Sequence, residues 1–170
     1  NSYADATTME AGKGAIDVAK AQRQHAVYRS EVARLGYQFE IVGRDDNSPD
    51  SVFIEDVATV AGGRVLIHRS GHSGRRVEAA GFARALADCG FESARVVEME
   101  TPATADGGDV LRVGSVLFVG LSARTNELGL RAIRSVFEPV GFTVQAVELP
   151  PGVLHLKCVC SMADQNHLVL

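Results

Sequence analysis

Three carboxylates, Asp50, Glu55 and Asp56, lie close together around the apolar run at positions 52–54. That run is rich in residues with strong β propensity, which predicts a strand. Two adjacent acids at the end of an apolar strand need a nearby cation if they are buried. A guanidinium group would suit them, because its N–H groups pair with carboxylate oxygens. An ordinary loop that keeps the acids in water explains the same residues, so this stretch alone leaves both interpretations open.

The composition is that of one globular domain with a core of its own. The chain has 170 residues, of which 46% are hydrophobic and 22% charged. A net charge of -4, with no basic block and no Trp, argues against a nucleic-acid partner. No run is long enough to cross a membrane, and there is no signal-peptide pattern. The three cysteines, Cys89, Cys158 and Cys160, form an odd set without framework spacing, which predicts a reducing, cytoplasmic environment.

Three helices are predicted, and each ends at a glycine that is followed by an aromatic residue. Apolar residues at three- and four-residue spacing predict the first helix, and Ser73 is a suitable cap for the second. The helices are expected at 13–35, 73–89 and about 125–140. Each glycine precedes a short strand-like run, at 37–42, 91–97 and 142–147.

A hairpin is predicted after each helix and its strand, at 52–67, 109–119 and 153–170, with turns near residues 62, 114 and 165. The same order of elements therefore recurs with a period of a little over fifty residues, which indicates stacked supersecondary units. We predict a single α/β domain over 1–170. It comprises a helix and strand at 13–42, ββαβ units at 50–98 and 106–148, and a hairpin at 153–170.

The first and last units lack part of this pattern. The chain begins with a helix and strand that have no preceding hairpin, and it ends on a hairpin without its helix. The apolar residues at 167–170 would leave an open sheet edge, which is prone to pairing with another chain. We therefore expect about three repeats, incomplete at both ends, or completed by another chain through oligomerisation or domain swapping.

Six segments in order resemble those of the dimethylargininases (dimethylarginine dimethylaminohydrolases). They are 16–25, 49–56, 104–111, 120–126, 154–157 and 158–163. The resemblance begins at about Gly14 and covers nearly the whole remaining chain. It implies a pentein-type, five-bladed α/β propeller of ββαβ units with a central pocket, as in the related arginine deiminases and amidinotransferases.

The resemblance also implies an activity. The family hydrolyses asymmetric dimethylarginine or monomethylarginine to citrulline and a methylamine, through a covalent intermediate on a cysteine thiolate. Neither a metal nor an organic cofactor is expected. The implied partner is a small methylated arginine.

The acids of the first motif match the family's ligands for the guanidinium group. Asp56 matches the acid that binds the guanidinium nitrogens, and Glu55 and Asp50 match neighbouring substrate ligands. Fixed carboxylates would orient the cation for attack on its carbon. Arg75 and Arg124 match the residues that bind the substrate α-carboxylate, although an arginine near a helix start is more often solvated.

The catalytic pair implied by the resemblance is His155 and Asp106. His155 matches the histidine that protonates the departing amine and activates water. Asp106 matches the acid that supports this histidine. Without the family pattern, a lone strand histidine indicates a structural hydrogen bond, and Asp106-Gly107-Gly108 indicates a turn.

The nucleophile is where this sequence departs from the family. The nucleophilic cysteine of the family lies in its last blade, and no residue of this chain matches it. Cys158 and Cys160 share the expected strand face of His155, yet the family has a non-catalytic cysteine there. A zinc site at this pair is weakly supported, because there is no second pair of cysteines. Cys89 is expected in the core.

Three hypotheses follow. The gene product is a dimethylargininase, and the 170 residues alone are inactive because the nucleophile is absent. Alternatively, the chain is an inactive binder of arginine analogues. In the third hypothesis it is an assembly module that another chain completes through its open sheet edges.

Overall fold

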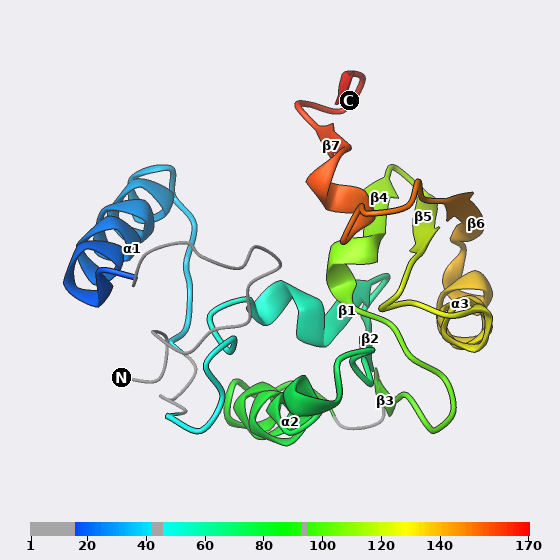
Figure 1. Cartoon of the computed structure of the whole chain (residues 1–170), viewed down its shortest axis with the longest axis horizontal. Helices are drawn as coiled ribbons and strands as arrows, with labels where there is room; N and C mark the ends of the chain where they lie inside the picture. Colours follow the sequence, from blue (N-terminus) through cyan, green and yellow to red (C-terminus); the bar gives the residue numbers. More distant parts are fainter. Residues whose placement is uncertain (1–15, 42–45, 93–94) are drawn as a thin grey trace. The chain divides into compact units, whose positions relative to one another are not determined.

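The computed structural model describes residues 16–41, 46–92 and 95–170, and the chain divides into two units, 1–52 and 53–170 (Figure 1). The first unit contains the helix α1 (Val18–Arg34). Its N-terminus is capped by the Asp17 carboxylate, which accepts a hydrogen bond from the Lys20 N–H at 2.9 Å. Gly36, just after the helix, has φ of 89°, as its predicted position at the helix end requires.

The strand predicted after this helix is wrong for the residues that the structure describes. Residues 37–41 have no regular structure, and residue 42 lies outside the described residues. A strand is stable only beside a partner, and no described segment pairs with 37–41. The prediction of a single domain over 1–170 stays a prediction.

The second unit begins with a three-stranded sheet. The strands β1 (Ala58–Ala61) and β2 (Arg64–Ile67) are antiparallel, and β2 is parallel to β3 (Val96–Glu98). The helix α2 (Glu78–Asp88) connects β2 with β3, after the short 3₁₀ helix η3 (Ser73–Arg75). The predicted helix and hairpin are therefore present, but the prediction that Ser73 caps the helix is wrong, because Ser73 lies in η3 and Val77 is the N-cap of α2. Strand β3 is shorter than the predicted 91–97, of which residues 93 and 94 lie outside the described residues.

The second sheet repeats this topology. The strands β4 (Val110–Val113) and β5 (Val116–Leu121) are antiparallel, and β6 (Thr143–Glu148) runs parallel to β5 after the helix α3 (Glu127–Phe137). The register of the two hairpins can be compared at their first pairs, Ala58↔Ile67 and Val110↔Val119. Both residues of the second pair lie 52 positions after the matching residues of the first (110 − 58 and 119 − 67). The predicted period of a little over fifty residues is therefore reproduced in the strand register.

The third hairpin is shorter than the predicted 153–170. The strand expected to carry His155, Cys158 and Cys160 is wrong, because His155 precedes the 3₁₀ turn that contains Cys158 and the first strand begins only at Ser161. The strands β7 (Ser161–Met162) and β8 (Leu168–Val169) are antiparallel, and the turn lies between them as predicted.

A 3₁₀ turn precedes each hairpin, namely η2 (Ile54–Val57), η5 (Gly107–Asp109) and η7 (Leu156–Cys158). The prediction that the first strand begins at residue 52 is therefore wrong, because β1 begins only at Ala58. The backbone of η2 packs so closely on η5 that a side chain at Gly107 would collide with the Glu55 carbonyl. This contact between turns places residues 54–57 outside the sheet.

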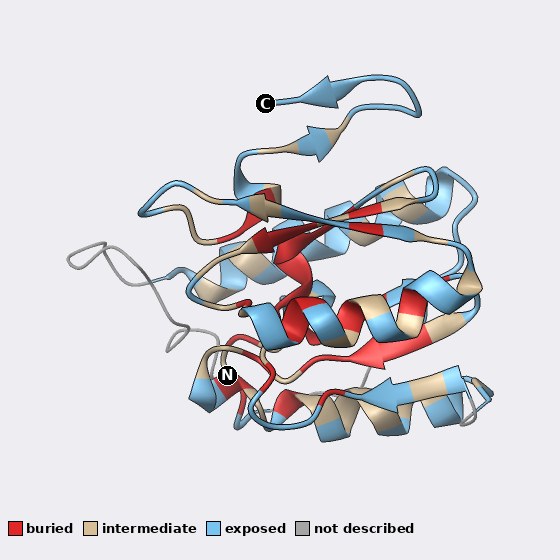
Figure 2. Ribbon diagram, turned by 90° about the vertical axis from the view of Figure 1, so that its right-hand side faces the viewer, coloured by how far each residue is buried: buried red, intermediate tan, exposed pale blue. Residues whose placement is uncertain are grey.

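Strand β2 lies in the middle of the hydrophobic core. Val65 and Ile67 pack with α2, whereas Leu66 on the opposite face belongs to a larger cluster with α3 and the second sheet. All three are at most 1% exposed, and Figure 2 shows the buried strands between the two helices. Burial on both faces is typical of a strand with a parallel neighbour and a covering helix. The chain therefore has a mixed α/β fold with several small sheets. Among the described helices, none has both the length and the apolar character that crossing a bilayer requires.

Candidate active site

The three 3₁₀ turns that precede the hairpins contact one another, η2 with η5 and η5 with η7. Gly108 makes this approach possible, since a Cβ there would lie 2.8 Å from the His155 ring and 2.9 Å from the Asp56 carboxylate. The glycines of the Asp106–Asp109 segment are thus required by close packing rather than by a turn with positive φ. Acids and one histidine from three successive repeats meet here.

Asp56 lies at the centre of this group, with a side chain 14% exposed. One oxygen accepts a hydrogen bond from the Arg75 Nη1 at 2.6 Å, and the other accepts one from the Gly108 N–H at 2.9 Å. The Asp56 oxygen bound by Gly108, Oδ1, also lies 3.9 Å from the His155 Nε2. Asp56 is therefore held in place by two donors while it faces the imidazole.

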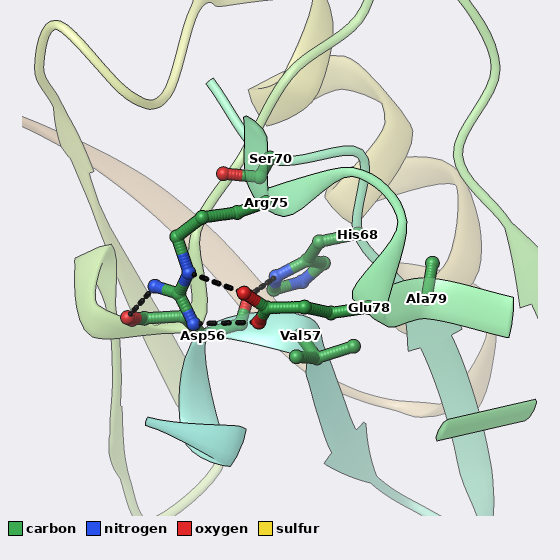
Figure 3. Close-up of a pocket in the computed structure, with 7 residues that line it drawn as sticks. All are labelled: Asp56, Val57, His68, Ser70, Arg75, Glu78 and Ala79. Atoms are coloured by element: carbon green, nitrogen blue, oxygen red, sulfur yellow. Dashed lines mark hydrogen bonds and ion pairs between the residues drawn. The ribbon is translucent and has the colours of Figure 1, made fainter. Parts of the chain in front are cut away.

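Arg75 is buried, which the prediction of a substrate ligand did not anticipate. Its guanidinium donates two hydrogen bonds to Glu78, at 2.8 and 3.0 Å, and one to the Phe53 carbonyl at 3.1 Å, besides the ion pair with Asp56 (Figure 3). Arg75, Glu78 and Asp56 line a small pocket with Val57, His68, Ser70 and Ala79. The proposed contact of Arg75 with a substrate carboxylate stays a prediction.

His68 lies behind Asp56 and was not singled out from the sequence. Its Nδ1 is 3.2 Å from the Asp56 carbonyl, and its Nε2 is 3.0 Å from the Thr59 hydroxyl. Because a carbonyl only accepts, Nδ1 carries the proton and Nε2 accepts from Thr59. Burial lowers the pKa of His68 to about 4, although the contact with Asp56 acts in the opposite direction. His68 is thus a neutral support for the backbone of Asp56.

Asp106 is fully buried and pairs with the second predicted arginine. Its Oδ2 is 3.2 Å from the Arg124 Nη1, and its Oδ1 accepts a hydrogen bond from the Gly71 N–H. The Arg124 side chain is 15% exposed. The structure therefore brings Asp106 and Arg124 together beside Asp56 and Arg75.

His155 precedes η7, with its ring between two acids. Its Nδ1 is 3.4 Å from the Asp109 Oδ2, an ion-pair distance without the alignment of a hydrogen bond, and its Nε2 faces Asp56. Burial lowers the pKa of His155, but Asp109, Asp56 and Asp106 outweigh it and raise this pKa above its ordinary value. Asp109 was not predicted from the sequence; the only signal was a second aspartate in the segment 106–109.

Glu55 lies at the rim of the group. Its side chain is 70% exposed and pairs with the Lys157 ammonium at 2.6 Å. Asp50 is buried but belongs to the first unit, so its predicted role as a substrate ligand stays a prediction.

The three cysteines are free thiols. The prediction that Cys89 lies in the core is wrong, because it follows α2 as its C-terminal cap and is exposed. Cys158 is also exposed and Cys160 is half-buried.

One carboxylate oxygen each from Asp56 and Asp106 and one ring nitrogen of His155 lie within 4.8 Å of one another. Both carboxylates already pair with arginines, so these groups suit an organic cation with hydrogen-bond donors better than a metal ion. We assign no metal to them, and the expected metal-free mechanism stays a prediction.

Comparison with known proteins shows similarity over most of the chain. A family model described as "Arginine deiminase" matches residues 6–170. The N(G),N(G)-dimethylarginine dimethylaminohydrolase of Streptomyces coelicolor is 40% identical over 142 residues, which cover 84% of this chain and 54% of that protein. The chain therefore spans about half the length of this curated relative.

Solved structures are similar over most of the chain. A dimethylarginine dimethylaminohydrolase from Pseudomonas aeruginosa, in complex with citrulline, is 31% identical, with a TM-score of 0.89 over 98% of this chain and 64% of that one. An amidinotransferase from Microseira wollei, 17% identical, has a TM-score of 0.71 over 84% of this chain and 52% of that one, which shows a shared fold only.

Proposed function

This chain belongs to the arginine deiminase family, and on that premise we propose that it forms the substrate pocket of a dimethylargininase. The substrate would be asymmetric dimethylarginine or monomethylarginine, and the products citrulline and a methylamine. The relatives named for this reaction, and the citrulline found in one of them, support the proposal. The repeated register supports a five-bladed propeller as the complete fold, with the open sheet edges closed by further repeats.

The observation that carries the proposal is the meeting of Asp56, Asp106 and His155. Two fixed carboxylates beside an imidazole offer acceptors for the N–H groups of a planar cation and a group that transfers protons. This combination suits hydrolysis at a guanidinium carbon.

The arginines complete the match to an amino-acid substrate. Arg75 pairs with Asp56, and Arg124 pairs with Asp106. A zwitterionic substrate could take the place of these ion pairs and still give each side chain an opposite charge. Its guanidinium would bind the acids, and its α-carboxylate would bind the arginines. Arg124 fits this role better, since the guanidinium of Arg75 is also bound to Glu78 and to the Phe53 carbonyl.

In the proposed reaction a cysteine thiolate attacks the guanidinium carbon. His155, as the imidazolium, gives a proton to the departing methylamine; as the neutral imidazole it then takes one from the water that releases citrulline. We assign the nucleophile to none of Cys89, Cys158 and Cys160, and propose that it is supplied from outside these 170 residues. The environment proposed for the reaction is the cytoplasm.

Titration calorimetry of the chain with asymmetric dimethylarginine tests the pocket. Asp56→Ala is expected to weaken binding by roughly 10- to 100-fold, because it removes charge-assisted hydrogen bonds to the guanidinium. The matched control Asp88→Ala, at an exposed acid on α2, should leave the affinity unchanged. Equal affinities for the wild type and Asp56→Ala would refute the pocket assignment.

Citrulline formation by the purified chain, with its intact mass confirmed, tests the nucleophile. We expect no turnover by the 170 residues. Steady turnover would show that one of the three cysteines, or a copurified protein, provides the thiolate. Binding without turnover by any longer form of the protein would instead support an inactive binder of arginine analogues.

Assembly is the second candidate function, and the exposed Leu168 and Val169 of β8 favour it. Pairing of this strand with another chain would give oligomers by size-exclusion chromatography, and Val169→Lys should reduce them. A monomeric wild-type chain would exclude this function.

A further inference from the structure

Asp109 is held in place by hydrogen bonds from three residues of the second unit. Its Oδ2 accepts hydrogen bonds from the hydroxyls of Ser122 and Thr125, both at 2.7 Å, and its Oδ1 accepts one from the Leu156 N–H at 3.0 Å. The residue has no exposed surface. Because of these donors and the neighbouring histidine, and despite its burial, the pKa of Asp109 lies below its ordinary value. Asp109 is therefore a fixed, ionised carboxylate.

This carboxylate holds His155 at two points. Leu156 is the residue after His155, so its bond to Asp109 fixes the backbone beside the histidine. The Asp109 Oδ2 lies 3.4 Å from the buried Nδ1 of the ring, which has no hydrogen-bond partner among the described residues. A small rotation of the ring would turn this contact into a hydrogen bond, and a buried N–H without an acceptor is otherwise costly.

The remaining charges around the ring lie elsewhere. Asp56 faces Nε2 from η2, and Asp106 binds Arg124 and Gly71. Lys157, on the same turn as His155, pairs with Glu55 at the rim. Among these groups, only Asp109 lies at ion-pair distance from Nδ1, so it is the acid placed to act there.

We propose that Asp109 is the positioning residue of the site: it keeps the proton of neutral His155 on Nδ1 and leaves Nε2 to exchange a proton with substrate and water. The consequence for catalysis rests on the proposed function. In that reaction Nε2–H of the imidazolium would protonate the departing amine. The same nitrogen would then take a proton from water as the hydroxide oxygen bonds to carbon, and the bond from that carbon to the cysteine sulfur would break to release citrulline and the thiolate. Nδ1 would keep its proton throughout, as a histidine oriented by a fixed carboxylate does.

The test is the tautomer of His155, measured in the full 170-residue chain by ¹⁵N NMR of the ring at a pH above its pKa. His155→Gln identifies the resonances among those of the five histidines. We expect the Nδ1–H form in the wild type. The Nε2–H form would overturn the proposal, even if no variant could be prepared.

Asp109→Asn and Asp106→Asn form a matched pair, because both remove a fully buried carboxylate beside the same turn. Asp109→Asn should lower the pKa of His155 by about one unit or more and mix its tautomers. Asp106→Asn should lower this pKa less and keep the tautomer. Equal effects on the tautomer would contradict a specific role of Asp109.

Thr125→Val covers the case in which Asp109→Asn does not fold. Loss of one hydroxyl that donates to Asp109 should raise the pKa of His155 by a few tenths of a unit, since that hydroxyl dipole opposes the imidazolium. A fall of the pKa would count against the proposal. These readouts need no turnover, so they separate the role of Asp109 from the proposed activity, which binding of asymmetric dimethylarginine tests independently.

Discussion

The two ββαβ repeats of the second unit share a topology and a strand register but use their arginines differently. In the first repeat Arg75 is only 8% exposed, with its guanidinium bound to Asp56, to Glu78 and to a carbonyl. In the second repeat Arg124 has one ion pair among the described residues, with Asp106, and its side chain is 15% exposed. The same fold thus contains one arginine that is bound by several groups and one with a single ion pair, for which the binding of a ligand stays a proposal.

The difference does not follow from the spacing of these residues. Arg75 lies three residues before Glu78, the first residue of α2, and binds it, while Arg124 lies three residues before Glu127, the first residue of α3. Arg124 nevertheless pairs with Asp106, and the amide of Asn126 caps α3, whereas Val77 gives α2 no side-chain cap. The comparison teaches that the same spacing of arginine and acid can lead to different ion pairs within a repeated topology, because tertiary contacts decide the partner.

The largest expected effect is on stability. Arg75→Ala should lower the free energy of unfolding by about 3–5 kcal/mol, because it leaves the buried carboxylate of Glu78 and the half-buried carboxylate of Asp56 without their cation. Arg124→Ala should lower it clearly less, and should mainly weaken binding of asymmetric dimethylarginine. Urea denaturation followed by circular dichroism measures both variants. Equal losses of unfolding free energy would contradict the difference between the two arginines.

The next effect is the pH dependence of the first repeat. His68 is buried and neutral, with its pKa lowered to about 4, whereas the position 52 residues later is Gly120 and does not titrate. The pKa of His68 is lower in the folded than in the unfolded state. The contribution of neutral His68 to the free energy of unfolding is therefore complete above about pH 6.5, and it is lost as the pH falls. The loss approaches about 3 kcal/mol at pH 4.

Unfolding free energies at pH 7 and pH 4.5 for the wild type and His68→Gln test this effect. The variant should be less sensitive to the lower pH, since it retains every other titratable group but lacks this one. An identical pH dependence in the two proteins would exclude His68 as the cause.

The smallest effect concerns the caps of the two helices. Asn126 accepts a hydrogen bond from the Gly129 N–H at 2.8 Å, whereas Val77 before α2 offers no side-chain cap. Asn126→Ala should therefore lower the unfolding free energy by about 1 kcal/mol. Val77→Ala is the control for α2, at an exposed side chain, and should change it by less than about 0.5 kcal/mol. Thermal unfolding compares the two, and a similar loss in both would refute the role of the cap.

Local patterns predicted much of the fold. The apolar spacing of α1, the glycine after α3 and the hairpin of β4 and β5 all lie where propensity and turn chemistry indicate. No strand begins at 52–54, and the 3₁₀ turn η2 starts at Ile54 instead, because close packing of η5 against η2 outweighs the β propensity of these residues. Strand 37–41 is absent for a related reason, since a strand needs a partner that local sequence does not supply.

The candidate site was predicted in part. Asp56, Asp106 and His155 meet, as the family resemblance implied, while Arg75 is bound by a second acid that the resemblance did not indicate. Asp109 and His68 were not predicted, because their importance depends on contacts with residues distant in the sequence. Asp109 contacts His155, 46 positions away (155 − 109), and His68 contacts Asp56, 12 positions away (68 − 56).

The sequence by itself determined the repeat, the helix ends and the identity of the acids and of the histidine. These properties depend on spacing, on propensity and on residue type, all of which are local. Which aspartate faces His155, which arginine is buried and which histidine is neutral were decided only by the tertiary structure. Each of these depends on burial and on distances of a few ångströms between turns from different repeats, and a charge in such a place is set by what surrounds it rather than by its neighbours in the chain.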